Sequence, residues 1–374
     1  MMFKILTLNK ISKTGLKNLP ESNYEILSEC ANPDGILLRS FDMHEMELPK
    51  TLLAAGRAGA GVNNIPIDKC SEKGIVVFNT PGANANAVKE LVIGGLILSS
   101  RKIYNGIAWC QGLNGTEGVA KAVEAGKSEF VGPEIAGKKL GLIGLGKIGF
   151  LVAQAACALG MEVLGYDVIK ANDNEFFKQV SSIDEIFKEC DYISLHVPAN
   201  AETKGMINTA AISKMKDGVR IINTARAELV NNADIKAAIG SGKVACYVTD
   251  FPVEDVLGTN GIVTIPHLGA STPESEENCA FMAAVQLRDY LETGSIVNSV
   301  NFPNTKLGGI SGKRLTVLHK KADGLVEKLD GIVKSKAIAS NTRGEYGYTV
   351  YDISDASCAD SLKAIDGVLA VRVI

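Results

Sequence analysis

The fold of this chain is decided by one glycine-rich stretch, Lys138-Lys139-Leu140-Gly141-Leu142-Ile143-Gly144-Leu145-Gly146-Lys147-Ile148-Gly149. Its residues 140–143 form a short apolar run that suits a buried parallel strand. Residues 150–159 follow without a helix breaker and are long enough for about three turns of helix. A second apolar run, residues 163–166, ends at Asp167. The pattern therefore predicts a strand, a glycine turn, a helix and a second strand.

This arrangement is typical of a dinucleotide-binding site. Gly144 permits the tight turn, Gly146 lets the backbone approach a pyrophosphate, and Gly149 lets the helix pack close to the strand. The helix N-terminus offers unpaired N–H groups to the phosphates. A glycine turn alone is equally compatible with a purely structural role, so Asp167 is the stronger indication, because it stands where a carboxylate binds the ribose 2′-hydroxyl. That carboxylate would repel a 2′-phosphate, and residues 168–169 offer no arginine, so NAD is favoured over NADP.

The composition excludes several classes of protein. The 374 residues suit two or three domains, and 46% of them are hydrophobic, enough for a large core. A net charge of −3 with no basic stripe argues against nucleic acid or a membrane surface as a partner and favours a small molecule. The eight scattered cysteines show no CxxC and no metal-ligand spacing. Together with the absence of a signal-peptide pattern, they predict reduced thiols, no metal and a cytoplasmic location.

Alternation of apolar strands and helical stretches predicts an α/β chain made of three domains. Residues 1–100 form a first parallel α/β domain, which residues 285–305 complete. Residues 101–284 hold the glycine turn and about six strands in a doubly wound sheet, preceded at 104–138 by a helix and a loop. Residues 306–374 read strand, helix, strand, strand, helix, strand. The predicted fold is thus two doubly wound Rossmann-like parallel-sheet domains plus a small C-terminal ferredoxin-like α+β domain.

Polar residues follow three successive predicted strands of the second domain. Arg226 follows the strand at 219–224, Asp250 ends the next strand with Glu254 and Asp255 just beyond it, and His267 follows the strand at 262–265. Ligands of open parallel sheets bind beyond these carboxyl ends. Each residue alone is more often a loop or surface group, and only their joint placement indicates a site.

Such a set fits hydride transfer between a dinucleotide and a 2-hydroxy acid. Arginine can hold a substrate carboxylate with two parallel hydrogen bonds. Histidine can move the hydroxyl proton near neutral pH, and a carboxylate beside it would orient the ring and raise its pKa. The sequence therefore predicts a dehydrogenase with Arg226 and His267 in its site.

The chain also resembles a known family in several motifs. These are Gly144-Leu-Gly-Lys-Ile-Gly149, Asn223-Thr-Ala-Arg226, Pro266-His-Leu-Gly-Ala-Ser-Thr272, Gly56-Arg-Ala-Gly-Ala-Gly-Val-Asn-Asn-Ile65 and Asn79-Thr-Pro81. Together they resemble the D-isomer-specific 2-hydroxyacid dehydrogenases over residues 1 to about 300. The C-terminal unit, ending Ala364-Ile-Asp-Gly-Val-Leu-Ala-Val-Arg-Val-Ile374, resembles an ACT domain. This pairing implies NAD-linked oxidation of 3-phosphoglycerate at the start of the phosphorylated route to serine, by a homodimer or homotetramer.

The resemblance also implies roles for single residues. Arg226 would hold the substrate carboxylate, His267 would be the acid/base, and a glutamate would partner it. Cofactor contacts are implied for Thr80, Gly144, Gly146, Lys147, Ile148, Gly149, Asp167, Thr224 and Asp250. Substrate contacts are implied for Arg39, Arg57, Arg226 and His267. Arg57 could be a plain surface arginine, but the glycine-rich turn beside it favours the site.

Two departures from the family pattern bear on function. Asp250 directly precedes Phe251-Pro252, where the family has one intervening residue. Matching on Phe-Pro selects Glu254 as the partner of His267, and counting from Asp250 selects Asp255; Glu254 is favoured for the match and for its length.

The second departure lies in the C-terminal unit. Serine-sensing members carry Asn two residues after the histidine matched by His319, and here that position is Lys321. Their Pro-Gly turn is Asp323-Gly324 in this chain. Both differences favour a role in assembly over serine feedback.

Two rival functions remain compatible with part of the pattern. A glyoxylate or hydroxypyruvate reductase of the same family would act on non-phosphorylated acids, and Arg57 and the C-terminal unit argue against it. An NAD-sensing regulatory protein would be expected to carry an interaction tail or a basic region, and neither is visible in the sequence.

Overall fold

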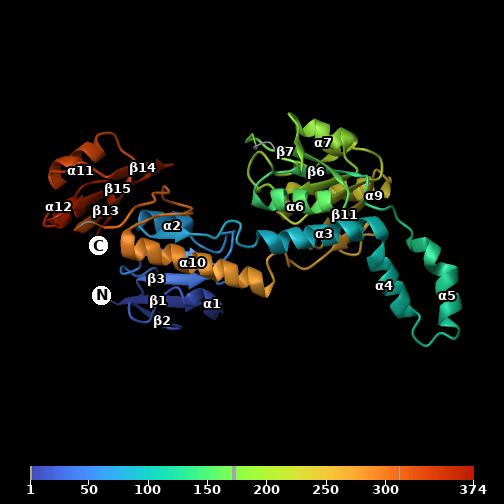
Figure 1. The fold of residues 1–374 in the computed structure, drawn as a ribbon, viewed down its shortest axis with the longest axis horizontal. Helices are drawn as coiled ribbons and strands as arrows, with labels where there is room; N and C mark the ends of the chain where they lie inside the picture. Colours follow the sequence, from blue (N-terminus) through green and yellow to red (C-terminus); the bar gives the residue numbers. More distant parts are fainter. Residues whose placement is uncertain (1, 171–173, 311) are drawn as a thin grey trace. The chain divides into compact units, whose positions relative to one another are not determined.

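A computed structural model describes residues 2–170, 174–310 and 312–374. The chain forms two compact units. Residues 1–84 and 273–374 make the first, and residues 85–272 make the second. Figure 1 colours the chain by sequence, so the blue and orange-to-red parts are the first unit and the cyan-to-yellow parts are the second.

The first unit contains a parallel five-stranded sheet in the order β2-β1-β3-β4-β5. Its strands are β1 (Phe3–Leu8), β2 (Tyr24–Leu27), β3 (Gly35–Leu38), β4 (Ala54–Arg57) and β5 (Val76–Phe78). This order is that of a doubly wound sheet, as predicted. Strand β2 was not predicted from the sequence, because it is an edge strand with only Tyr24 buried, and one buried residue leaves no apolar pattern to detect.

Three helices accompany this sheet: α1 (Lys13–Leu16), α2 (Ile67–Glu72) and the long α10 (Pro273–Thr293). Helix α10 buries a stripe of small and branched residues, including Ala283 and Leu287, in one core with Ile5 and Leu37 of the sheet. After α10 the chain returns to the sheet edge, where the Asn301 side chain bonds both the N–H of Val77 and the carbonyl of Ile75. The helix and this return segment hold the two distant parts of the first unit together.

The second unit contains a parallel seven-stranded sheet in the order β12-β11-β10-β9-β6-β7-β8. Its strands are β6 (Lys139–Ile143), β7 (Glu162–Tyr166), β8 (Lys178–Gln179), β9 (Tyr192–Leu195), β10 (Val219–Asn223), β11 (Val244–Thr249) and β12 (Ile262–Thr264). The strand order reverses between β6 and β9, which is where such sheets bind nucleotides. The six predicted strands are confirmed, and β8 is a seventh, too short to show as an apolar run.

Helices cover both faces of this second sheet. One face packs against α3 (Ala85–Arg101) and α6 (Lys147–Ala158). The other packs against α7 (Ile183–Glu189), α8 (Thr209–Ser213) and α9 (Asn232–Gly240). A short 3-10 helix, η2 (Ala227–Leu229), follows β10. The doubly wound fold predicted from the glycine turn is therefore confirmed.

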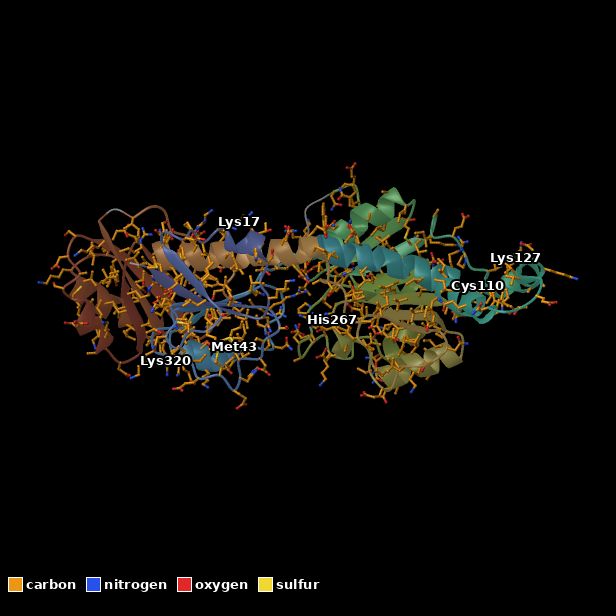
Figure 2. The ribbon with its side chains drawn as sticks, turned by 90° about the horizontal axis from the view of Figure 1, so that it is seen from below. Lys17, Met43, Cys110, Lys127, His267 and Lys320 are labelled. Carbon is orange, nitrogen blue, oxygen red and sulfur yellow. The ribbon has the colours of Figure 1, made fainter. Side chains whose placement is uncertain are left out.

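The second unit also carries a helical extension, formed by α4 (Ile103–Gly112), α5 (Val119–Gly126) and the 3-10 helix η1 (Lys127–Phe130). Figure 1 shows α4 and α5 side by side, and Figure 2 labels Cys110 on α4 and Lys127 at the start of η1. None of the described residues of these helices is buried. The sequence predicted one helix and a loop here, because a segment with no buried face has no clear apolar period.

The C-terminal residues form a four-stranded antiparallel sheet with two helices, in the predicted order. The elements are β13 (Lys313–Lys320), α11 (Leu325–Val333), β14 (Ala339–Arg343), β15 (Tyr346–Ile353), α12 (Ala359–Lys363) and β16 (Val368–Val373). The strands lie in the order β14-β15-β13-β16, which is that of a ferredoxin-like sheet. One face packs on α11 and α12, and the other joins the core around α10.

Side chains of this C-terminal sheet bond the carbonyls at the end of α10. Arg372 donates to Tyr290 O and Leu291 O, Arg314 to Thr293 O, and the Tyr348 hydroxyl to Gly294 O, at 2.6 to 3.3 Å. Arg314 is only 1% exposed and also forms a two-pronged ion pair with Asp352 at 2.7 and 2.9 Å. Apart from Tyr290 O, which also accepts from Gly294 N, these are carbonyls that a helix end leaves without a helical partner, and positive charge is favourable there.

Among the described helices, none is both long enough and apolar enough to span a bilayer.

Candidate functional site

The glycine turn after β6 has the geometry that the sequence predicts. Gly144 has a positive φ of 100°, and a Cβ there would lie 2.5 Å from the carbonyl oxygen of His196. A Cβ on Gly149 would lie 2.1 Å from Gly144 O. A Cβ on Gly146, in contrast, would meet nothing within 4 Å. Gly144 and Gly149 are therefore required by close packing, and Gly146 leaves open space beside the turn.

That space adjoins the N-terminus of α6, whose N-cap is Gly146. No side chain in the described structure caps this end, so the first N–H groups of the helix, including those of Lys147 and Ile148, stay available. Backbone N–H groups and the helix dipole favour a negatively charged ligand at such a position. The donor set and the open space fit the pyrophosphate of a dinucleotide.

Asp167 lies at the tip of β7 and is held by two backbone N–H groups. Its Oδ2 accepts from Leu145 N at 2.7 Å, and its Oδ1 accepts from Ile169 N at 3.0 Å. An ionised carboxylate has about four acceptor sites, so two hydrogen bonds leave room for ribose hydroxyls. The structure thus ties the ribose-binding candidate directly to the glycine turn, which sequence reasoning did not anticipate.

His196, directly after β9, is a residue at this site that sequence reasoning missed. Its backbone N–H donates to Ile143 O at 2.7 Å, and its ring Nε2 lies 2.9 Å from Ser194 Oγ. Burial lowers the pKa of His196 to about 4, so the imidazole is neutral at physiological pH. The strand-end rule that selected His267 would also have found His196.

At the end of β10, a buried asparagine shapes the turn that carries Arg226. Asn223 Oδ1 accepts from the N–H groups of Ala225 and Arg226 at 3.1 and 3.3 Å, and its Nδ2 donates to Arg226 O at 2.8 Å. The Arg226 guanidinium is exposed, with Nη1 donating to Ala225 O at 2.7 Å. Asn223 therefore fixes the backbone, while most guanidinium donors of Arg226 face outward.

At the end of β11, Asp250 is fully buried, and neither carboxylate oxygen makes a well-formed hydrogen bond within the described residues. Burial raises the pKa of Asp250, and the charge of His267, the Gly269 backbone N–H and the charge of Arg226 oppose that rise. Arg226, Asp250 and His267 follow β10, β11 and β12, which are neighbouring strands of the sheet. The structure thus brings together three residues that the sequence had placed on separate strand ends.

His267 lies in the exposed loop after β12 and is labelled in Figure 2. Its ring packs on Phe251, with centroids 4.9 Å apart and planes tilted by 53°. Glu254 and Asp255 are both exposed, and within the described residues neither forms an ion pair or hydrogen bond with His267. The choice of Glu254 over Asp255 as its partner stays a prediction.

Buried polar atoms are normally paired, so an unpaired one near the glycine turn or a strand end is a candidate ligand contact. In the described residues of the second unit, Thr224 Oγ1 and both Asp250 oxygens are in this state. In the first unit, Thr80 Oγ1, just after β5, is another. All three residues were predicted from the sequence to contact the cofactor. No group of three or more His, Cys, Asp or Glu among the described residues is arranged to hold a metal ion.

The two candidate substrate arginines of the first unit adjoin each other on neighbouring strands. Arg57 ends β4 and pairs in register with Leu38, the residue before Arg39. Arg57 Nε donates to Arg39 O and to Asn64 Oδ1, both at 3.1 Å. The side chain of Arg39 forms an ion pair with Glu276, in the first turn of α10.

The buried charge of Asp250 predicts a pH-dependent stability. The pKa of Asp250 in the folded state lies above its ordinary value of 3.8, so the folded state binds more protons than the unfolded state between these two pKa values. The free energy of unfolding therefore falls as the pH rises through that range. Replacing Asp250 with Asn should therefore stabilise the protein at pH 7 and raise its Tm. Thermal unfolding of both proteins across pH tests this. A variant that is less stable at pH 7, or a difference that does not shrink as pH is lowered, would contradict it.

Comparison with known proteins identifies the class. Residues 97–269 match the family model of the D-isomer specific 2-hydroxyacid dehydrogenase NAD binding domain. A D-3-phosphoglycerate dehydrogenase of Haemophilus influenzae is 34% identical over 349 residues, covering 88% of this chain and 83% of the relative. A putative D-3-phosphoglycerate dehydrogenase of Schizosaccharomyces pombe is 30% identical over 97% of this chain and 84% of its own length. The chain belongs to the D-isomer-specific 2-hydroxyacid dehydrogenase family.

Solved structures agree with this assignment. The NAD+-bound 3-phosphoglycerate dehydrogenase of Entamoeba histolytica is 29% identical, with a TM-score of 0.66 over 82% of this chain and 100% of that one. A glyoxylate reductase from Paecilomyes thermophila is 27% identical, with a TM-score of 0.65 over 80% of this chain and 98% of that one. The similar structures thus include both a 3-phosphoglycerate dehydrogenase and a glyoxylate reductase.

Proposed function

We propose that this protein is an NAD-dependent dehydrogenase that oxidises 3-phospho-D-glycerate to 3-phosphohydroxypyruvate, the first step of the phosphorylated route to L-serine. The observation that carries the proposal is the placement of Arg226, Asp250 and His267 after β10, β11 and β12, neighbouring strands of the sheet that holds the glycine turn. The relatives named as D-3-phosphoglycerate dehydrogenases support this substrate. A glyoxylate or hydroxypyruvate reductase is less favoured, because the full-length relatives reported above carry the other name.

NAD is the cofactor, held by groups that the fold already presents. The N–H groups of Lys147 and Ile148 bind the pyrophosphate beside Gly146, and Asp167 binds the ribose. Thr80, Thr224 and Asp250 contact the cofactor through their unpartnered polar atoms. When bound, the nicotinamide supplies the acceptor for the hydride.

The remaining chemistry belongs to three side chains of the protein. Arg226 binds the substrate carboxylate with two parallel hydrogen bonds and so orients C2. As the hydride leaves C2, an imidazole nitrogen of His267 takes the proton of the C2 hydroxyl, and the C=O double bond forms. Glu254 then stabilises the resulting imidazolium.

The substrate phosphate is bound by the first unit. Arg39 and Arg57, on adjoining strand ends, provide the positive charge for it. We assign the five-stranded sheet of the first unit to substrate binding, the second unit to NAD, and the C-terminal sheet to an ACT-like domain with a role in assembly. A cytoplasmic location fits the cysteine usage.

The helical extension supports a homo-oligomer. Its exposed large apolar side chains include Ile103, Tyr104, Ile107 and Val119. A helical hairpin with apolar side chains and no described buried residue gains stability by packing against another chain. We propose that this extension contributes to a dimer, from which a tetramer can be built.

A comparison of substrates tests the proposed function. With NAD, kcat/KM for 3-phosphoglycerate should exceed that for D-glycerate by about 30-fold or more, because loss of a paired charge costs about 2 to 5 kcal/mol. Steady-state rates with both acids, and in reverse with 3-phosphohydroxypyruvate and glyoxylate, provide the measurement. Equal or better activity with glycerate or glyoxylate would exclude the phosphorylated substrate.

A further inference from the structure

The ion pair between Arg39 and Glu276 joins a substrate-binding candidate to a helix that has no role in the reaction described above. Arg39 directly follows β3, and Glu276 lies in the first turn of α10, both within the first unit. The two side chains are 31% and 45% exposed. Ion pairs as exposed as this one contribute little to stability and are readily broken.

The main chain of Arg39 is firmly held, in contrast to its side chain. Its carbonyl oxygen accepts from Arg57 Nε at 3.1 Å and from Asn64 Nδ2 at 3.2 Å. Asn64 Nδ2 also donates to Phe41 O at 2.7 Å. The backbone beside Arg39 is therefore fixed next to Arg57, and the guanidinium is the part that can exchange partners.

Glu276 also has a purely structural explanation, because acidic residues are favourable in the first turn of a helix. Glu274 occupies the same turn and is equally exposed, but no ion pair links it to the described residues. Glu277, the next acid, accepts instead from Thr14 Oγ1 at 3.4 Å. Of these three acids, Glu276 alone reaches an arginine that the proposed function assigns to the substrate.

We propose that Glu276 competes with the substrate phosphate for Arg39 and so acts as a specificity-determining residue. This inference rests on the proposed function. A phosphate carries about −1.5 to −2 charges and can accept two parallel hydrogen bonds from a guanidinium, so it displaces a single carboxylate. A substrate without a phosphate does not displace Glu276 and leaves Arg39 paired within the protein. Glu276 is a positioning residue, since it acts through Arg39 and touches no reacting atom.

Replacing Glu276 with Gln tests the competition, with Glu274→Gln as the matched control. The E276Q variant should lower the KM for 3-phosphoglycerate about two- to fivefold, the range that an exposed ion pair allows, with kcat and NADH affinity unchanged. The KM for D-glycerate should not change, because that acid carries no phosphate. E274Q removes an equal charge from the same helix turn and should leave both KM values at the wild-type level.

A double variant separates competition from a general charge effect. In an R39A background, which itself raises the KM for 3-phosphoglycerate, adding E276Q should produce no further change, since the competitor has lost its target. An unchanged or increased KM in E276Q alone would overturn the proposal, as would an equal decrease in E274Q. An equal decrease with D-glycerate would also overturn it, because Arg39 would then serve the carboxylate. Failure of the proposed function is distinct from all of these, because the wild-type enzyme would then not turn over 3-phosphoglycerate.

Discussion

Replacing His267 with alanine should lower kcat by roughly 10²- to 10⁴-fold, the range over which a positioned general acid or base acts. His267 follows β12, the neighbour of the strand that ends at Asp250, and its charge lowers the pKa of that carboxyl. Removing the imidazole removes the acceptor for the hydroxyl proton but leaves the glycine turn and Asp167 intact. Steady-state kinetics with 3-phosphoglycerate and NAD measure the loss.

The control for this variant is NADH binding, followed by fluorescence titration. The dissociation constant should stay within about twofold of the wild-type value, because the backbone donors at α6 lie on a different loop. Turnover that survives the substitution would remove His267 from the mechanism. A loss of NADH affinity as large as the loss of turnover would instead assign His267 to cofactor binding.

Replacing Arg226 with alanine should reduce kcat/KM for 3-phosphoglycerate by about 10²- to 10³-fold, which corresponds to about 3 to 4 kcal/mol. The residue is exposed, and only one of its guanidinium bonds is made within its own turn, to Ala225 O at 2.7 Å. The side chain therefore contributes little to folding, and its loss should not change Tm. Kinetics and thermal unfolding of the same preparation separate the two effects.

An Arg226→Lys variant distinguishes charge from geometry. Lysine keeps the positive charge but cannot form two parallel hydrogen bonds with a carboxylate. Its kcat/KM should therefore lie between the alanine variant and the wild type. If lysine restored full activity, Arg226 would act only as a charge, and its proposed role in orienting C2 would be wrong.

Much of the fold could be predicted because buried parallel strands are continuous apolar runs. The run before Gly144 and the runs before Arg226, Asp250 and His267 all correspond to strands of the second sheet. Elements that bury little were missed for the same reason. Strand β2 buries only Tyr24, and the extension α4–α5 buries no described residue, so neither has a periodic signal.

The candidate site could be predicted in part because strand ends meet at one edge of a parallel sheet. That rule alone placed Asp250 and His267 together, and the effect of His267 on the Asp250 pKa agrees with it. It could not reveal that Asn223 shapes the Arg226 turn or that Asp167 is bonded to Leu145, because those are hydrogen bonds of the folded chain.

The bonds at the end of α10 bear on how this protein can be shortened or altered. Arg314, Arg372 and Tyr348 supply donors to the last carbonyls of a helix that also forms the core of the first unit. A chain cut before β13 would expose those carbonyls and an apolar helix face to water together. The C-terminal sheet is therefore part of the folded core of the first unit, and its removal should lower the stability of that unit.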